Sequence, residues 1–372
     1  MRLLDHVVQC TAPFLVRQKS GQVWRLTSAG DFSQAVTRCP LRFVLTDELV
    51  RVCIELAYSR GEELRGCLDL VHLPAEQLWV EWSEPARRHA LRCVIPQGVP
   101  ADGMDVERCG VLICSAGSGR SGSLRTFFLT GIEPRQPLVA ALETLLDLDG
   151  TGPPESPATV LQGGGVRVCD PQNEHLNDVL RCARFRLDPT WQRYYGSVLA
   201  NPLLATQVIR LLISSVAFDP PMLLALFLLM TIRADLVRKA VKPARLNRKR
   251  LRFGRPPLLE HVEVSTPLLI QDGYRDTQKH TPVRNGPRFH HVRGHIVRRH
   301  DTVYWRGPHW RGHLRLGGCA VARSSCECSE QQREPLRRKA HDRVSGVAAA
   351  LRVSRRIGCT DLMPHFETGE RT

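Results

Sequence analysis

The whole excess of positive over negative charge lies in the last third of this chain, and that partition constrains the fold more than any other feature. The 372 residues carry a formal net charge of +15, from 52 Lys and Arg against 37 Asp and Glu. Residues 1–240 hold 25 basic and 25 acidic side chains, so residues 241–372 carry the whole excess, with the remaining 27 and 12. Ten of the 14 histidines also follow residue 240. Because clustered Lys and Arg attract anions, we expect a neutral folded front and a chemically distinct basic end.

The neutral front has the patterns of an α+β domain. Hydrophobic residues make up 42% of the chain, which is enough to bury an ordinary core. Thr46 precedes an apolar repeat at helical spacing, which predicts a capped amphipathic helix, and Pro137–Leu148 has the spacing of a second helix. Short runs rich in β-forming residues predict strands at 78–82, 91–95, 111–115 and 123–129. The expected fold class is α+β, with an antiparallel sheet and packed helices in a domain of residues 1–150.

The rest of the chain divides into four expected segments. Residues 151–166 are rich in Pro and Gly and predict a linker or long loop. Residues 167–240 predict a helical segment packed on the front domain, with one helix from Asn173 through Arg186 and two more beginning at Asn201 and Asp219. Residues 241–317 predict a basic, His- and Arg-rich β module that opens with a basic helix at 244–253 and a strand at 258–264. Residues 318–372 lose the apolar pattern, so we expect a disordered C-terminal tail.

Cysteine usage and hydropathy indicate the compartment. The 13 cysteines are odd in number and have no framework spacing, and the first residues do not resemble a secretory signal. A reducing compartment is expected. The most apolar run, Met222–Ile232, is about half the roughly 20 residues that a membrane-spanning helix needs, so it predicts a buried helix and no membrane partner.

One nine-residue segment, Cys114–Gly122, resembles the signature loop of the cysteine-dependent protein tyrosine phosphatases. In that family the loop follows a strand and opens a helix, and its backbone and arginine hold a phosphate while the cysteine attacks. The resemblance implies Cys114 as nucleophile, Arg120 as phosphate clamp and Ser121 as the hydroxyl that aids thiolate departure. Ile113 departs from the family's histidine, and the flanking β-formers equally predict a simple hairpin tip.

A second group of candidate residues lies in a predicted hairpin of two strands, 289–298 and 302–306. Alternation along a strand puts His291, Arg293 and His295 on one face. The same interpretation extends the polar side with Arg298, Arg299 and Arg306. The aromatic ring of Trp305 could stack on a base, and the arginines could contact phosphates. The alternative is a solvated hairpin whose tryptophans pack on its own domain.

The histidines and cysteines after residue 308 do not predict a metal site. His309, His313, Cys319, Cys326 and Cys328 are close in sequence. Their spacing lacks the paired Cys-x2-Cys knuckle of structural zinc sites. We expect no metal and no other cofactor.

Three basic segments carry a resemblance at the level of the whole chain. Residues 246–259 read LNRKRLRFGRPPLL, residues 290–295 read HHVRGH, and residues 308–312 read PHWRG. These segments resemble an uncharacterised family of phage and prophage proteins of proteobacteria, in which a neutral α+β front precedes a similar basic end. The resemblance implies a phage or prophage origin, a bacterial cytoplasm as the location, and no established activity. From Cys319 onward the chain departs from that family's pattern.

Together these observations predict a non-enzymatic, phage-type protein whose basic C-terminal region contacts nucleic acid or another anionic partner. The alternatives are a cysteine-dependent phosphatase using the Cys114-to-Arg120 loop, and a structural or virion-associated protein that contacts a phage or host protein. The residues predicted to contact DNA or RNA are Arg248, Lys249, Arg250, Arg252, Arg293, Arg298, Arg299, Arg306, His291, His295 and Trp305.

Overall fold

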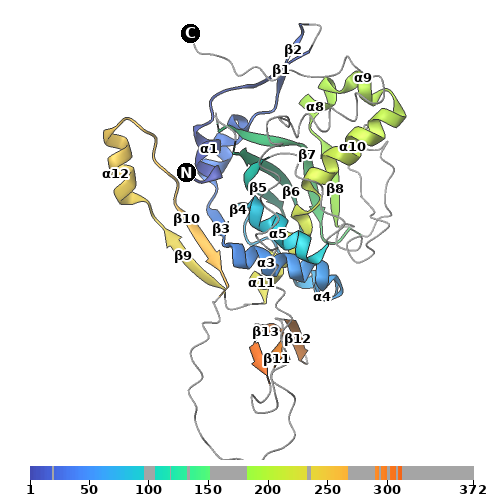
Figure 1. The fold of residues 1–372 in the computed structure, drawn as a ribbon, viewed down its shortest axis with the longest axis vertical. Coiled ribbons are helices and arrows are strands. Elements are labelled where there is room, and N and C mark those ends of the chain that lie inside the picture. The colour runs from blue at the N-terminus through green and yellow to red at the C-terminus, as the bar shows by residue number, and fades with distance from the viewer. Residues whose placement is uncertain are drawn as a thin grey trace, which may run out of the picture. The chain divides into compact units, whose positions relative to one another are not determined.

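The computed structural model describes residues 1–18, 21–95, 105–117, 119–131, 135–150, 182–232, 236–266, 290–292, 295–299, 302–306 and 309–311 (Figure 1). These residues form two compact units. The first contains the described residues of Met1–Leu228 and Arg238–Ser265, and the second contains those of Leu229–Val237 and Thr266–Val344.

An eight-stranded mixed sheet organises the first unit. In spatial order its strands are β8 (Ala183–Leu187), β7 (Pro137–Asp147), β6 (Ser121–Thr130), β5 (Val106–Ala116), β4 (Gln77–Ser83), β3 (Leu41–Leu45), β10 (His261–Ser265) and β9 (Val237–Val241). From β8 to β4 every neighbouring pair is antiparallel, whereas β3 is parallel to both β4 and β10. The predicted α+β class, with a largely antiparallel sheet and packed helices, is confirmed.

The parallel strands β3 and β4 are joined by a helical crossover, because the chain must return to the end of the sheet at which β3 began before it can start a parallel strand. The first helix of the crossover, α3 (Asp47–Ile54), begins after Thr46, whose side chain accepts a hydrogen bond from the Leu49 N–H at 3.5 Å. This is the cap that the sequence predicted. The crossover continues through a π-helical turn (Glu55–Ser59), α4 (Gly61–Arg65) and a 3-10 turn (Leu68–Leu70).

A buried carboxylate holds the N-terminal helix α1 (Leu3–Gln9) against the sheet. The Leu3 and Leu4 N–H groups donate to Glu81 at 2.9 and 3.0 Å, and Arg108 pairs with the same carboxylate. Because Glu81 is fully buried, these donors replace the water that its charge would otherwise need. The next elements are β1 (Phe14–Arg17), β2 (Val23–Leu26), a 3-10 turn (Ala29–Phe32) and α2 (Ser33–Arg38).

The most apolar helix, α11 (Asp219–Thr231), lies in the core. The seven side chains of Met222–Leu228 are each 0% exposed, so this part of the helix is covered on every side. The predicted buried helix is confirmed. In the described part of the chain, Leu203–Thr231 is the one stretch long and apolar enough to cross a membrane, and 67% of its most apolar window is buried. This stretch includes all of α10 (Pro202–Val216) except its first residue; α8 (Pro189–Tyr194) and α9 (Gly196–Leu199) precede α10.

A buried ion network joins α11 to α5 (Glu84–Val94) and to β6. The Arg87 guanidinium donates to both oxygens of Glu84, at 2.7 and 2.8 Å, and to Asp219 at 2.6 Å. The Thr126 hydroxyl donates to the other oxygen of Asp219 at 2.8 Å. These four residues are at most 4% exposed. The network therefore fixes one edge of α5 to the first residue of α11.

Three sequence predictions are wrong at the level of secondary structure. Pro137–Leu148, predicted as a helix, forms β7, which lies between β6 and β8. Its residues Val139–Leu142 are buried on both faces, and such a continuous apolar run also satisfies helical spacing. Residues 91–95, predicted as a strand, end α5, a helix that Ser83 caps and Pro85 opens. The helix predicted from Asn173 to Arg186 is wrong over its last residues, which belong to β8, and residues 173–181 lie outside the described residues.

The other predicted elements of the front are confirmed. Strands occupy 78–82, 111–115 and 123–129, and helices begin at Pro202 and Asp219. The sheet also includes β8, β9 and β10, so it extends beyond residue 150 and takes in part of the segment predicted as the basic module. The predicted linker at 151–166 and the predicted tail at 318–372 lie outside the described residues.

Candidate functional site

A basic helix stands at the end of an arm on the edge of the sheet. The arm consists of β9, α12 (Ala244–Arg252) and the return to β10, and Figure 1 shows α12 set apart from the helices that cover the sheet. No residue of α12 is buried. The predicted basic helix at 244–253 is thus confirmed, and it projects from the first unit.

Local sequence defines the end of α12. Gly254 adopts a φ of +65°, a left-handed conformation that glycine adopts without strain. The Gly254 N–H donates to the Leu251 carbonyl at 3.0 Å, and the Arg255 N–H donates to the Arg250 carbonyl at 2.9 Å. This pair of bonds is the Schellman motif, and Pro256 and Pro257 then prevent the helix from continuing.

One face of α12 is attached to the returning chain. The Asn247 side chain donates to the Leu258 carbonyl at 2.9 Å and accepts from the Leu258 N–H at 2.8 Å. The Arg250 Nε donates to the Pro256 carbonyl at 2.8 Å. Asn247 and Arg250 are partly covered, whereas every other residue from Ala244 to Arg252 is exposed. This face therefore orients the helix on the arm.

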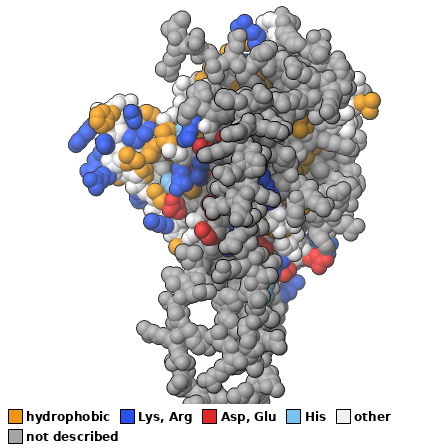
Figure 2. All heavy atoms as spheres, in the orientation of Figure 1, with side chains coloured by type: hydrophobic (Ala, Val, Ile, Leu, Met, Phe, Trp, Pro, Cys, Tyr) orange, Lys and Arg blue, Asp and Glu red, His pale blue; other side chains and the backbone are white. Residues whose placement is uncertain are grey.

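The opposite face of α12 is a stripe of exposed cations. With about 100° of rotation per residue, Arg245, Arg248, Lys249 and Arg252 fall within a sector about 100° wide, centred opposite the midpoint between Asn247 and Arg250. All four are exposed. Residues 237–259 contain nine Lys or Arg and no Asp or Glu. We call these four residues the α12 cation face; Figure 2 shows the blue side chains gathered on the projecting arm.

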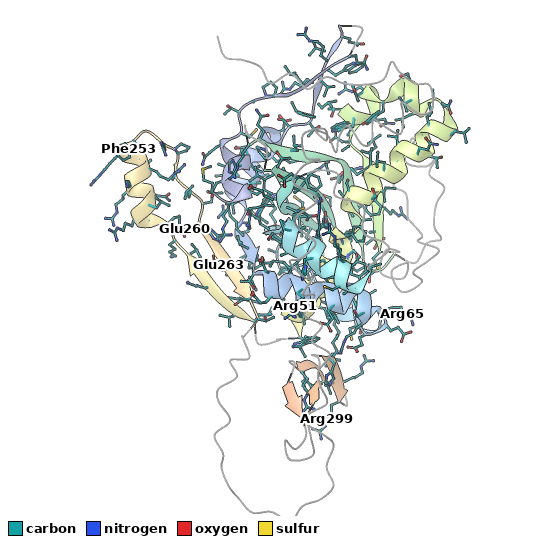
Figure 3. The ribbon with its side chains drawn as sticks, viewed as in Figure 1. Arg51, Arg65, Phe253, Glu260, Glu263 and Arg299 are labelled. Atoms are coloured by element: carbon teal, nitrogen blue, oxygen red, sulfur yellow. The ribbon has the colours of Figure 1, made fainter. Side chains whose placement is uncertain are left out.

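Exposed apolar side chains border the α12 cation face. Leu246, Leu251 and Phe253 are 49%, 60% and 69% exposed. Helical rotation places Leu246 and Phe253 on one side of the cations and Leu251 on the other. Figure 3 shows Phe253 at the end of the arm.

The base of the arm is fixed to α1 and to the sheet. The Leu259 N–H donates to Asp5 at 2.9 Å, and Arg2 pairs with Glu263 at 2.9 Å. The Thr46 N–H donates to the Val264 carbonyl at 3.0 Å, beside the parallel pairing of β10 with β3. These contacts give the returning half of the arm a defined position on the first unit.

The predicted hairpin is confirmed in the second unit. β12 (His295–Arg299) pairs with β13 (Thr302–Arg306), so that His295 lies opposite Arg306 and Arg299 opposite Thr302. β11 (His290–Val292) pairs with β14 (His309–Arg311) in the continuing register, with His291 opposite Trp310. These strands form two two-stranded antiparallel sheets that share one register, and we call them together the ribbon.

The register corrects one predicted side chain. Paired residues share a face, so Arg299 and Arg306 lie on the face of His295. Arg298 lies on the other face, with Ile296 and Trp305, and its predicted place on the side of His295 is wrong. Trp305 is partly covered, whereas Arg298, Arg299 and Arg306 are exposed. Arg293 lies outside the described residues.

The segment that resembles the phosphatase loop has a different local structure. Cys114 lies in β5 opposite Ser123, Ser121 opens β6, and the described residues between them form the tip of the β5–β6 hairpin. The phosphatase loop needs a helix at this point, whose N–H groups bind the phosphate. The hairpin interpretation of this segment is confirmed.

The chemistry of the two key side chains also differs from that of a phosphatase. Burial, and to a smaller extent the nearby Glu143 charge, raises the pKa of the Cys114 thiol, whereas a nucleophilic cysteine needs a lowered pKa. Arg120 donates to Asp149 at 2.7 Å and to the carbonyls of Asp69 and Val71, each at 3.1 Å. The guanidinium is thus used to attach the hairpin tip to neighbouring loops.

A pocket lies where β3 and β10 end and α3 begins. Its lining includes Thr46, Asp47, Arg2 and Arg108. Each of the two arginines is paired with a glutamate, Arg2 with Glu263 and Arg108 with Glu81. In the described residues, no group of three or more His, Cys, Asp or Glu is placed to hold a metal ion; His313 and the cysteines after it lie outside them.

Among the sequence candidates on α12, the structure brings together Arg248, Lys249 and Arg252 and separates Arg250, which bonds to the returning chain. Arg245 belongs to the same face and is absent from the predicted set. A helical projection of residues 244–252 would have found it. No protein-family model, curated protein or solved structure matches this chain.

Proposed function

We propose that this protein binds nucleic acid through the α12 cation face. One observation carries the proposal: the outward side of a projecting helix holds four cations, Arg245, Arg248, Lys249 and Arg252. The opposite side of the same helix is hydrogen-bonded to the arm. A phosphate backbone that contacts this face releases counterions, and their release favours binding.

The surroundings of α12 support an anionic partner. The arm contributes further exposed cations, Arg238, Lys239 and Lys242, and has no acidic residue up to Leu259. The two carboxylates that follow are Glu260, exposed just before β10, and Glu263 on β10, which is paired with Arg2. Nine cations against these two glutamates leave the arm with an excess of positive charge.

The β12–β13 ribbon is proposed as a second contact, because Arg298, Arg299 and Arg306 are exposed on it. The resemblance to phage and prophage proteins supports a setting in a bacterial cytoplasm, where phage or host DNA and RNA are available. In this proposal the protein acts by binding, without a chemical step.

The test is a salt titration of the full-length protein. Fluorescence anisotropy with labelled 30-residue DNA and RNA, from about 50 to 300 mM salt, compares the wild type with the variant Arg245→Gln/Arg248→Gln/Lys249→Gln/Arg252→Gln. Each lost phosphate contact reduces the slope of log K against log salt by about 0.7 to 0.9, so we expect the variant's slope to fall by about 1.5 if two of the four cations contact phosphate and by about 3 if all four do.

A charge-matched control removes four exposed helical arginines elsewhere in the first unit: Arg38, Arg51, Arg65 and Arg193, each changed to Gln. Figure 3 shows Arg51 and Arg65 on α3 and α4, apart from the arm. The control should keep most of the wild-type slope. Equal losses in both variants would mean that net charge alone drives binding, and the proposed role of α12 would then be wrong.

A further inference from the structure

We infer that α12 is a groove-reading helix whose ligand is duplex DNA, with Arg245 and Arg252 directed at base edges and Arg248 and Lys249 at phosphates. This inference rests on the proposed function and names its substrate class. It follows from the place of α12 on the arm, from the order of the cations around the helix, and from the chemistry that the cation face lacks.

The first step concerns access. The major groove of B-form DNA is about 12 Å wide and admits one α-helix, which is about 10 to 12 Å across with its side chains. A helix that protrudes from its domain enters that groove more readily than one set into a flat surface, because the surrounding domain does not meet the DNA backbone first. α12 has no buried residue and stands at the end of the β9–β10 extension, so its outward side can enter without such a collision (Figure 1).

The second step concerns the order of the side chains around the helix. Arg245 and Arg252 lie at the centre of the cation face, about 20° apart in projection, while Arg248 and Lys249 lie about 50° to either side. A helix seated in a groove points its central side chains at the base pairs and its marginal side chains at the two flanking strands. Arginine forms a bidentate pair with the O6 and N7 atoms of guanine, whereas lysine contacts phosphate as a point charge.

The axial spacing gives the inference a length scale. Arg245 and Arg252 are seven residues apart, which is roughly 10 Å along the helix axis. Base pairs repeat every 3.4 Å, so the two guanidinium groups span about three base-pair steps. We therefore expect a short recognition element with guanines about three base pairs apart.

The third step separates duplex DNA from other nucleic acids. Proteins that bind single strands stack bases on aromatic side chains, and the α12 cation face contains none; Phe253 lies at its border. The major groove of A-form RNA is too deep and narrow for side chains to read. Leu246 and Phe253, exposed beside the cations, offer apolar contact to thymine methyl groups in the same groove.

The first experiment measures which ligand competes for the full-length protein. A labelled 24-base-pair DNA duplex of random sequence is displaced at about 150 mM salt by the unlabelled duplex, by one of its strands, by a 24-base-pair RNA duplex, or by vesicles of phosphatidylglycerol and phosphatidylcholine. We expect the DNA duplex to compete at least about tenfold better than each of the others. The four-residue Gln variant should lose this preference, and the Arg38, Arg51, Arg65 and Arg193 control should keep it.

The outcomes separate the inference from the proposed function. Equal competition by single strands, lost in the α12 variant, would overturn the duplex assignment and leave nucleic-acid binding through α12 standing. Duplex binding that is unchanged in the α12 variant would overturn both the inference and the role of α12. Binding to vesicles in place of DNA would overturn both and identify α12 as a membrane-surface helix.

A second experiment tests the orientation. In methylation interference with one duplex of defined sequence, selected from this pool by binding to the protein, a methyl group on guanine N7 occupies the major groove, and we expect it to reduce binding by roughly 5- to 100-fold at the contacted guanines. Arg252→Ala should remove the sensitivity at one guanine and Arg245→Ala at the other, about three base pairs away. Lys249→Gln should keep both sensitivities and reduce only the salt slope, by about 1. Methylation interference that is the same in Arg245→Ala, in Arg252→Ala and in the wild type would overturn the groove assignment.

Discussion

At the scale of single residues, the cost of burying charge is concentrated in the network of Glu84, Arg87 and Asp219. Arg87 forms three charge-assisted bonds inside the protein, and burial would otherwise oppose its charge strongly. Glu84 has a second cationic partner, because Arg88 donates to it at 3.0 Å, and Asp219 also accepts from Thr126 at 2.8 Å. Removing Arg87 still takes the shared guanidinium from two buried carboxylates, which is more damaging than removing the ion pair as a whole.

We predict that Arg87→Met lowers the free energy of unfolding by about 3 to 5 kcal/mol, because it leaves buried charge uncompensated. Urea denaturation followed by circular dichroism measures this loss. The triple variant Glu84→Gln/Arg87→Met/Asp219→Asn, which removes all three charges, should be more stable than Arg87→Met alone. If Arg87→Met unfolded at the same urea concentration as the wild type, Arg87 would not be needed to balance the buried carboxylates.

The pH dependence of stability should reveal Asp219. Burial raises its pKa to about 6, against the opposing effects of Arg87 and of the Thr126 hydrogen bond. An acid with a raised pKa in the folded state keeps its proton when the unfolded chain has lost it. The stability that protonated Asp219 contributes is therefore fully present below about pH 4 and is lost as the pH rises through about 6.

We accordingly predict that the stability of the wild type relative to Asp219→Asn declines between pH 4 and pH 7, by up to about 3 kcal/mol. Denaturation at half-unit pH intervals measures the difference. Asp188→Asn is the control of opposite sign: burial favours a higher pKa for Asp188, but hydrogen bonds from Thr190 and Thr27 lower it overall. The stability that Asp188 supplies should be lost as the pH falls. A flat difference for Asp219 would contradict its raised pKa.

At the scale of elements, the sequence predicts best where a local signal decides the structure. The cap at Thr46, the Asn-Pro and Asp-Pro starts of α10 and α11, and the basic helix before Gly254 each lie within a few residues, and all are confirmed. β7 fails for the opposite reason. Val139–Leu142, in its first half, are buried on both faces, and the elements beside β7 include β8 and α10, which lie farther along the chain, so this run carries no period that identifies a strand.

The end of α12 gives a prediction at this scale. Gly254→Ala introduces a side chain at a φ of +65°, where nothing obstructs the Cβ, so the cost is conformational: about 1 to 2 kcal/mol. We expect faster amide hydrogen exchange across α12 and weaker nucleic-acid binding. Gly196→Ala is the matched control, because its Cβ also meets open space and its φ is not positive. Equal exchange rates in both variants would show that the Schellman motif does not determine the order of the arm.

At the scale of the whole molecule, the charge partition in the sequence is not a boundary between structural units. β10 pairs with β3, although more than 200 residues separate them, so the basic arm grows from the neutral sheet. Neither this pairing nor the link from Arg87 to Asp219 has a local signal in the sequence. The ribbon of β11 to β14 belongs to the second unit, and its basic residues are thus distinct from those of the arm.

This separation of the two basic elements leads to the last prediction. If the α12 cation face and the ribbon contact the same nucleic acid, their counterion effects add, because each phosphate contact releases its own ions. Changing Arg298, Arg299 and Arg306 to Gln should reduce the salt slope for a DNA duplex by up to about 2.7, independently of α12. Combining these changes with the four α12 substitutions should give the sum of the two reductions, measured by anisotropy on the full-length protein. If the ribbon variant keeps the wild-type slope while the α12 variant does not, α12 alone forms the interface. A combined loss no greater than either single loss would mean that the two sets of contacts depend on each other, and it would contradict the additivity predicted here for independent contacts.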